Sequence, residues 1–244
     1  MRKLILVSLF CLVYNILHSQ KQYNYLFYVD NTVRTGALLF NEKTNTAEYI
    51  DKMENLKSTK AEGKPVFTVS VDGFNDFVYY KKNVNELNYT YELLKIPYFI
   101  NDSTININWE LHSDQKEIQG LNCKKATTFF RGRKWTVWYC PDIPVVYGPW
   151  KFYGLPGLMV EVTEDTNRFA FVLIEILEKP TAVLPNLNLS KHKQIDLKTF
   201  DEIFHDAMNL KDLKNSRGYV IEGEPFKRQG IELLYEWEEQ PKKQ

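Results

Sequence analysis

The sequence predicts a β-rich α+β fold: a large curved antiparallel sheet, of which a half-barrel is one form, with one helix packed on it. The chain has 15 tyrosines and 15 phenylalanines. Many of them fall in short apolar runs separated by turn residues, which is typical of strands. A single stretch near the C-terminal end has apolar residues at helical spacing. No linker is visible, so residues 20–244 are expected to form one domain.

The strand-like runs are rich in β-branched and aromatic residues and are bounded by turn residues. They fall at 25–29, 37–40, 47–50, 66–71, 77–80, 87–94, 98–100, 105–111, 158–162, 168–177 and 231–235. The polar stretch 51–64 is expected to be a loop, and 164–167 is expected to be a hairpin turn. Short connections of this kind favour antiparallel pairing between neighbouring strands.

A helix is predicted at about 196–214. Asp196 is a suitable N-cap, and Gly218 lies just beyond the predicted end. Acidic residues occupy the face opposite the apolar one, so the apolar face is expected to pack on the sheet rather than on a membrane. The apolar positions are Leu197, Phe200, Ile203, Phe204, Ala207 and Met208.

Residues 123–140 are expected to form a hairpin around the two-residue turn Arg131-Gly132. Cys123 then lies opposite Cys140 at a non-hydrogen-bonded pair, where Cα atoms are about 4.5 Å apart, near the lower end of disulfide spacing. A disulfide is therefore predicted, with two buried free thiols as the alternative. A three-residue turn would instead place the cysteines on opposite faces. The expected core face carries Ala126, Thr128, Phe130, Trp135, Val137 and Tyr139.

The other face of this hairpin is mixed. Its aromatic residues Phe129 and Trp138 either line a groove or pack under a neighbouring segment. Basic residues also gather around the hairpin, where they either meet anionic groups or form a solvated tip that guards against strand aggregation. These basic residues are Lys124, Lys125, Arg131, Arg133, Lys134 and Lys151.

After the hairpin the chain is expected to leave the sheet, because prolines interrupt a central strand. Leu155-Pro156-Gly157-Leu158 has proline and glycine at the central positions of a type II turn, from which the chain re-enters the sheet. The predicted turn-forming residues are Gly148, Pro149, Gly154, Pro156 and Gly157. The residues predicted to bind a ligand or partner are Trp138, Trp150, Phe152, Tyr153 and Leu155.

Residues 1–19 are predicted to be a secretory signal peptide, with a basic start at Arg2 and Lys3 followed by an apolar run too short and interrupted for a membrane span. Acylation of Cys11 is the alternative. Removal of this segment leaves a net charge of −2, which argues against a nucleic-acid-binding protein. It also leaves two cysteines, as expected of a disulfide-bonded exported protein. The mature chain is expected to have no transmembrane segment and to be periplasmic, associated with the outer membrane, or secreted.

The stretch GPWKFYGLPGLM (148–159) resembles the signature of the GLPGLI family, which are secreted proteins of Bacteroidota. The resemblance extends through CKKATTFFRGRKWTVWYCPDIP (123–144) and more weakly over 23–177. Met159 stands where the signature has isoleucine, a volume-conserving exchange. The resemblance implies export and an association with the outer membrane and TonB-dependent transport, but no activity and no catalytic residues. The pattern is also similar to periplasmic half-barrels that hold lipidic ligands.

The sequence contains no recognised catalytic or metal-binding motif. The histidines do not occur in HExxH spacing, and neither a GxSxG elbow nor a phosphate-binding glycine loop is present. No catalytic residue, metal or cofactor is therefore predicted. The favoured hypothesis is a non-enzymatic module that binds a hydrophobic or lipidic ligand or an outer-membrane transport component. The alternative is an envelope hydrolase acting on peptides or glycans, whose carboxylates would be Asp142, Glu161, Glu164 and Asp165.

Overall fold

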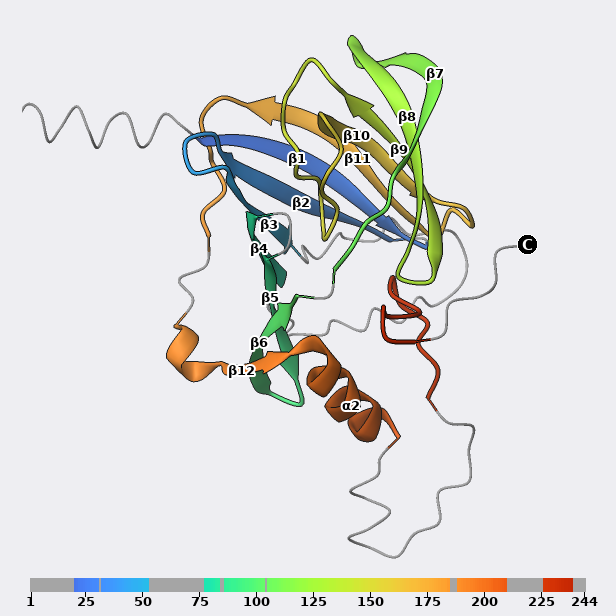
Figure 1. Cartoon of the computed structure of the whole chain (residues 1–244). Helices are drawn as coiled ribbons and strands as arrows, with labels where there is room; N and C mark the ends of the chain where they lie inside the picture. Colours follow the sequence, from blue (N-terminus) through green and yellow to red (C-terminus); the bar gives the residue numbers. More distant parts are fainter. Residues whose placement is uncertain are drawn as a thin grey trace, which may run out of the picture.

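A computed structural model describes residues 20–30, 32–52, 77–83, 86–103, 105–184, 188–209 and 226–238. Within these residues the chain forms one open sheet of twelve strands and one α-helix (Figure 1). This confirms the predicted β-rich fold with a packed helix. The predicted signal peptide, the predicted strand at 66–71 and the predicted helix end beyond 209 lie outside the described residues.

The elements follow the predicted alternation of short strands and turns. They are β1 (Gln20–Val29), β2 (Thr32–Asn41), β3 (Thr46–Lys52), β4 (Phe77–Asn83), β5 (Glu86–Leu93), β6 (Ile96–Asp102), β7 (Glu110–Ile118), β8 (Leu121–Phe130), β9 (Arg133–Cys140), β10 (Leu158–Glu164), β11 (Phe169–Leu177), a 3-10 turn η1 (Leu189–Lys191), β12 (Lys193–Asp196) and α2 (Leu197–Met208).

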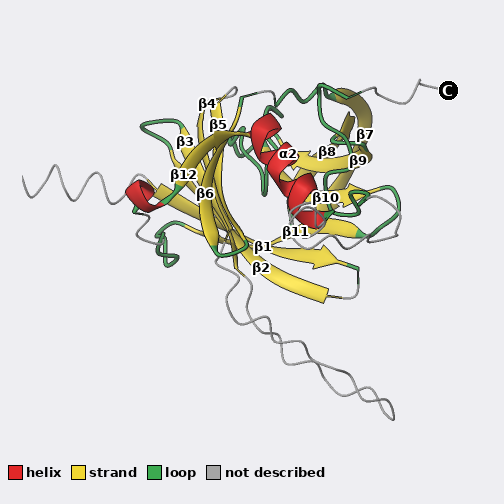
Figure 2. Ribbon diagram, turned by 90° about the horizontal axis from the view of Figure 1, so that it is seen from below, coloured by secondary structure: helices red, strands yellow, loops and turns green. Residues whose placement is uncertain are grey.

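The strand order in the sheet is β12-β6-β5-β4-β3-β2-β1-β11-β10-β9-β8-β7. Two meanders, β1–β6 and β7–β11, are joined where β1 pairs with β11. Each neighbouring pair is antiparallel except β12 and β6, which are parallel. Viewed from below, the strands curve around α2 (Figure 2). The concave face of the sheet therefore faces α2.

Two strand predictions are wrong. The run 105–111 is irregular up to residue 109, and the strand there is the polar β7. Because β7 is an edge strand whose residues are mostly exposed, it lacks the apolar alternation that sequence reasoning requires. The run 231–235 does not form a strand either. No sequence pattern indicated the short strand β12, and it was not predicted.

Helix α2 begins as predicted, with the Asp196 carboxylate accepting a hydrogen bond from the Thr199 N–H at 2.9 Å. The helix ends at Met208, earlier than the predicted residue 214. Phe200 lies on its buried face, with its ring centroid 5.2 Å from those of both Tyr91 and Tyr98. These edge-on contacts join α2 to β5 and β6 and confirm that its apolar face packs on the sheet.

The hairpin of β8 and β9 has the predicted register. Lys124 pairs with Tyr139 and Phe130 pairs with Arg133, around a turn in which both Arg131 (φ 54°) and Gly132 (φ 78°) are left-handed. Two consecutive positive φ values define a type I′ turn, which matches the twist of the paired strands. The predicted core face is also correct, since all six of its side chains are buried.

The loop between β9 and β10 folds back on itself through short hydrogen bonds. The Gly148 N–H donates to the Phe152 carbonyl at 2.9 Å, and the Gly154 N–H donates to the Val146 carbonyl at 2.7 Å. Gly154 has φ +96°, a left-handed conformation that favours glycine. The left-handed φ explains the glycine at position 154.

The predicted type II turn at Pro156 is wrong. The Gly157 N–H donates to the Leu155 carbonyl at 2.9 Å, which is the two-residue spacing of a γ-turn. Gly157 is required by a close approach: a β-carbon there would lie 2.6 Å from the Cys140 carbonyl carbon and 2.8 Å from the Pro141 Cα. Its role is to let the loop pass against the end of β9.

Candidate functional site

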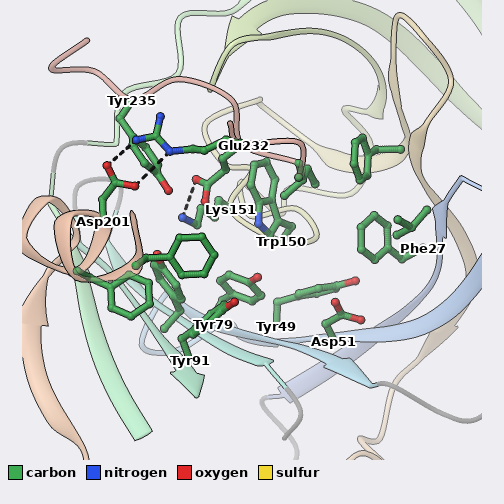
Figure 3. Close-up of a pocket in the computed structure, with 18 of the residues that line it drawn as sticks. Phe27, Tyr49, Asp51, Tyr79, Tyr91, Trp150, Lys151, Asp201, Glu232 and Tyr235 are labelled. Carbon is green, nitrogen blue, oxygen red and sulfur yellow. Dashed lines mark hydrogen bonds and ion pairs between the residues drawn. The ribbon is translucent and has the colours of Figure 1, made fainter. Parts of the chain in front are cut away.

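A cavity of about 350 Å³ lies between the sheet, α2 and the C-terminal segment 226–238 (Figure 3). This volume is within the range of small-molecule sites, about 300–1,000 Å³. More than half of the lining residues are aromatic. The lining residues are Phe27, Val29, Arg34, Tyr49, Asp51, Tyr79, Tyr89, Tyr91, Trp150, Lys151, Phe169, Phe171, Phe200, Asp201, Phe204, Phe226, Arg228, Gly230, Ile231, Glu232 and Tyr235.

Strand alternation places these aromatic rings. Side chains two residues apart share a face of the sheet, so Tyr49 and Asp51 of β3 both reach the cavity, as do Phe169 and Phe171 of β11. Neighbouring strands then bring rings together across the face. Phe27 of β1 stacks on Phe171 with ring centroids 4.2 Å apart. The cavity wall is therefore a continuous aromatic surface carried by paired strands.

The charged side chains of the lining occur in pairs of opposite sign, so the wall carries three cations and three carboxylates. In Figure 3, Asp201 and Tyr235 lie on one side of the cavity, and Tyr49 and Asp51 lie on the other. The pairs are Arg34–Asp51 at 3.6 Å, Lys151–Glu232 at 2.8 Å and Arg228–Asp201 at 2.5 Å.

Beside the cavity is a buried charge cluster, which we define as Asp102, Arg131, Lys151, Glu232 and Glu236. Lys151 and Glu232 also line the cavity. Asp102 accepts hydrogen bonds from Arg131 at 2.7 Å and from Lys151 at 3.0 Å, and none of these three side chains is more than 1% exposed. Arg131 also lies 3.2 Å from Glu232 and 3.0 Å from Glu236. The cluster joins β6, the hairpin turn, the C-terminal segment and the loop between β9 and β10 (residues 141–157), which we call the Gly-Pro loop.

The cations of this cluster keep its buried carboxylate ionised. Burial raises the pKa of Asp102, but the charges of Lys151 and Arg131 outweigh it, so the pKa lies below its ordinary value of 3.8. Burial lowers the pKa of Arg131, and the carboxylates of Glu232 and Asp102 more than compensate. Both groups are therefore charged at neutral pH.

The C-terminal segment is held against the hairpin by backbone contacts as well as charges. Arg133 donates to the Gly230 carbonyl at 2.7 Å and to the Ile231 carbonyl at 3.1 Å. The Leu233 N–H donates to the Arg131 carbonyl at 2.9 Å. These contacts hold residues 226–238, which contribute six residues to the cavity lining, without the strand pairing that the sequence suggested.

The residues predicted to bind a ligand or partner do not lie together in the structure. Trp150 lines the cavity, whereas Phe152 and Leu155 are completely buried and do not line it. The Phe152 ring packs edge-on against Trp135 with centroids 4.9 Å apart. Phe152 and Leu155 therefore belong to the packed core that supports the site.

The other two predicted binding residues also lie away from the cavity lining. The Tyr153 hydroxyl donates to the Ile105 carbonyl at 3.1 Å. Trp138 is half-buried on the hairpin face opposite the core, with the Lys116 ammonium 4.5 Å from the ring centroid. Of the five predicted residues, only Trp150 lines the cavity.

The six basic residues predicted to cluster around the hairpin differ in their burial. Arg131, Arg133 and Lys151 are buried and paired with carboxylates. Lys124 and Lys134 are exposed, and Lys125 is half-buried. The solvated-tip interpretation is therefore wrong for the first three residues, whose charges act inside the fold.

Cys123 and Cys140 are both buried free thiols in the structure, so the predicted disulfide is not formed there. The pairing of the two strands extends to Lys124 and Tyr139, one position short of the cysteines. Burial, followed by the charges of Cys140 and Glu161, raises the pKa of the Cys123 thiol to about 11. As a thiol, Cys123 is therefore protonated at neutral pH.

The carboxylates proposed for a hydrolase are not brought together at the cavity, since none of the four lines it. Glu164 is buried and paired with Arg133, Asp165 pairs with Lys134, and Glu161 pairs with Lys116. Within the described ranges, no group of three or more His, Cys, Asp or Glu residues could hold a metal ion. Over the same ranges, no helix has the length and apolar character needed to cross a membrane.

Sequence reasoning missed most of the cavity lining. The aromatic residues of β3 and β5, such as Tyr49, Tyr89 and Tyr91, were identified as strand residues without a shared role. Asp51 was assigned instead to the loop predicted at 51–64, although β3 extends to Lys52. The aromatic residues could have been grouped from the sequence, because residues two apart on a strand lie on the same face of the sheet. The contribution of residues 226–238 had no such signal, because that segment has no regular secondary structure.

A family model described as a protein of unknown function (Porph_ging) matches residues 131–161, which contain the hairpin turn and the Gly-Pro loop. No curated protein matches the chain. In fold, the chain is similar to PNGF-II in two crystal forms. One has 18% identity and a TM-score of 0.54 over 76% of this chain and 33% of PNGF-II, and the other has 19% identity and a TM-score of 0.51 over 75% and 32%.

The chain thus spans about a third of the length of PNGF-II. At this identity the likeness concerns the fold alone. An uncharacterized conserved protein from Thermus thermophilus aligns with 7% identity and a TM-score of 0.39, over 75% of this chain and 94% of that protein. The matched family segment contains Trp150 and Lys151 of the cavity lining and Arg131 of the buried charge cluster.

Proposed function

We propose that this protein is a non-enzymatic binding module of the cell envelope that holds a mainly apolar small molecule in the cavity between the sheet, α2 and residues 226–238. The observation that carries this proposal is the cavity itself, with its preformed aromatic wall. Pockets of this size, lined by apolar and aromatic side chains with a few polar groups, are typical of small-molecule sites.

Binding is favoured over hydrolysis because each carboxylate of the lining has a cation as a partner. Asp51, Asp201 and Glu232 each form an ion pair with a lining residue. A carboxylate engaged in an ion pair is not free to transfer a proton to a substrate. Glycosidase-like chemistry needs one carboxylic acid that stays protonated beside one that is ionised.

Filling the cavity is expected to abolish ligand uptake. Val29 is half-buried in the lining, and Val29→Trp places an indole ring in the space a ligand would occupy. We expect the affinity for the neutral fluorescent probe N-phenyl-1-naphthylamine to fall by about tenfold or more. Fluorescence titration of both proteins measures the change, and circular dichroism checks that the variant is folded.

The matched control is Val183→Trp, because Val183 is 82% exposed and does not line the cavity. Its affinity for the probe should equal that of the unmodified chain. Equal binding by the folded Val29→Trp variant would show that the probe binds elsewhere. Absence of probe binding by the unmodified chain would reject the cavity as an apolar binding site.

We further propose that the protein is exported, on the basis of residues 1–19 and the resemblance to the GLPGLI family, and that it acts beside an outer-membrane transport component. In an oxidising compartment Cys123 and Cys140 would form the disulfide, which would add about 3 kcal/mol of stability. Intact-mass spectrometry of protein purified from the envelope should give an N-terminus at Gln20 and no alkylatable thiol. Two alkylated cysteines would reject the disulfide, and a retained or acylated N-terminal segment would reject signal cleavage before Gln20.

A further inference from the structure

The Arg34 guanidinium differs from the other two cations of the cavity lining in its hydrogen bonds. Lys151 and Arg228 each donate hydrogen bonds to two carboxylate side chains. The Arg34 side chain makes no hydrogen bond to the described part of the chain, and its one ion pair, with Asp51, is 3.6 Å long. Because a guanidinium has five N–H donors, Arg34 retains unused donors at the site.

Arg34 lies at one end of the cavity, over its aromatic wall. Its guanidinium carbon is 5.9 Å from the centroid of the Phe27 ring, and Phe27 and Asp201 lie at opposite ends of the cavity in Figure 3. The Arg34 side chain is 27% exposed, whereas Phe27 is only 6% exposed. Val29, the next lining residue on β1, is also half-buried. Arg34 therefore stands at a rim where the aromatic wall meets solvent.

A carboxylate on a ligand would satisfy the unused donors of Arg34. Charge-assisted N–H···O bonds are about 2.7–2.9 Å long, and a guanidinium can bind one carboxylate through two of them. The Asp51 carboxylate lies beyond this distance from Arg34. A carboxylate at the rim also stays partly hydrated, which lowers the cost of bringing a charge to an aromatic cavity. Lys151 and Arg228 already have carboxylate partners and offer an anion no comparable site.

We propose that the ligand is a mainly apolar carboxylic acid, whose carboxylate binds the Arg34 guanidinium at the rim and whose apolar part packs in the cavity. The proposal rests on the binding function proposed above and adds the chemical class of the ligand. Phe27, which lies beneath Arg34 and stacks on Phe171 with ring centroids 4.2 Å apart, would contact the apolar part next to the carboxylate.

Displacement of N-phenyl-1-naphthylamine by naphthalene and 2-naphthoate at neutral pH tests this proposal, because the two competitors differ by one carboxylate. The unmodified chain should bind 2-naphthoate at least as tightly as naphthalene. Arg34→Met combined with Asp51→Asn removes the guanidinium and keeps the net charge of the lining unchanged. In this double variant the affinity of 2-naphthoate relative to naphthalene should fall about tenfold, because the charge-assisted contact is lost.

Two further variants separate the contact from general effects of charge. Arg34→Lys keeps the positive charge beside Asp51 but lacks the planar pair of donors, so the same affinity ratio should fall by about threefold. The matched control is Arg168→Met, which should leave the ratio unchanged. The Arg168 guanidinium carbon lies 5.2 Å from the centroid of the Phe169 ring, but Arg168 donates to Asp30 at 2.8 Å and 3.2 Å and does not line the cavity.

Naphthalene shows in each variant whether the cavity is intact, and Arg34→Lys decides alone if the double variant fails to bind it. An unchanged ratio in the Arg34 variants, or an equal fall in Arg168→Met, would overturn the role of Arg34 and leave the proposed binding function standing. Weaker binding of 2-naphthoate than of naphthalene by the unmodified chain would overturn the carboxylic acid class alone. If neither compound displaces the probe from the unmodified chain, both the proposed function and the ligand class are rejected.

Discussion

Replacing Arg131 with methionine is expected to lower the free energy of unfolding by about 3–5 kcal/mol, because it removes one partner from a buried charge cluster. The Arg131 side chain is 0% exposed and lies beside Asp102, Glu232 and Glu236. Without it, Lys151 alone remains to balance three carboxylates in this cluster. Because methionine keeps much of the length of the arginine side chain, the decrease in the free energy of unfolding comes mainly from the lost charge.

Urea denaturation followed by tryptophan fluorescence measures this change. The control is Lys134→Met on the same hairpin, whose ammonium lies 3.5 Å from Asp165 with both side chains well exposed. Exposed pairs contribute little, so this control should change stability by less than about 1 kcal/mol. Similar losses in both variants would contradict the view that the buried cluster, rather than surface charge, stabilises the fold.

Replacing Gly157 with alanine is expected to destabilise the protein by about 2–5 kcal/mol, combining a steric clash with an unfavourable φ of +158°. The atoms that a β-carbon would meet belong to the backbone of Cys140 and Pro141, so no side chain can turn aside. Relief requires the loop to move away from the end of β9. Leu158, which pairs with Cys140 in the sheet, would be displaced with it.

The matched control is Gly120→Ala in the turn between β7 and β8. Gly120 has φ +78°, and a β-carbon there would meet nothing within 4 Å. This variant should therefore show only the conformational cost, about 1 kcal/mol. Thermal and urea denaturation of both variants separate the two effects. Equal losses would mean that the close approach at Gly157 contributes nothing beyond its backbone conformation.

The central hairpin shows how far local sequence chemistry can predict structure. Arg131-Gly132 suits a type I′ turn, and turn length determines the pairing of every residue on both strands. The register and the buried face were therefore correct. The turn at Pro156 was predicted from the same rules and was wrong, because a contact between Gly157 and the distant end of β9 decides its geometry.

The candidate site was predicted less well than the fold. Aromatic residues on the Gly-Pro loop were expected to face a ligand, and of these Trp150 alone lines the cavity. Phe152 and Leu155 carry the same apolar character but point into the core. Hydrophobicity predicts that a side chain will be buried. It cannot distinguish burial by other side chains from burial by a bound molecule.

By itself the sequence determined the strand-rich architecture, the late amphipathic helix and the register of the hairpin, since these depend on periodicity and turn chemistry within short stretches. Only the tertiary structure decided which charges are buried and where the cavity lies. Asp102, Arg131 and Glu232 are far apart in the chain and meet only when β6, the hairpin turn and residues 226–238 come together. Such contacts depend on the curvature of the sheet and on the path of an irregular segment, and neither has a local pattern in the sequence.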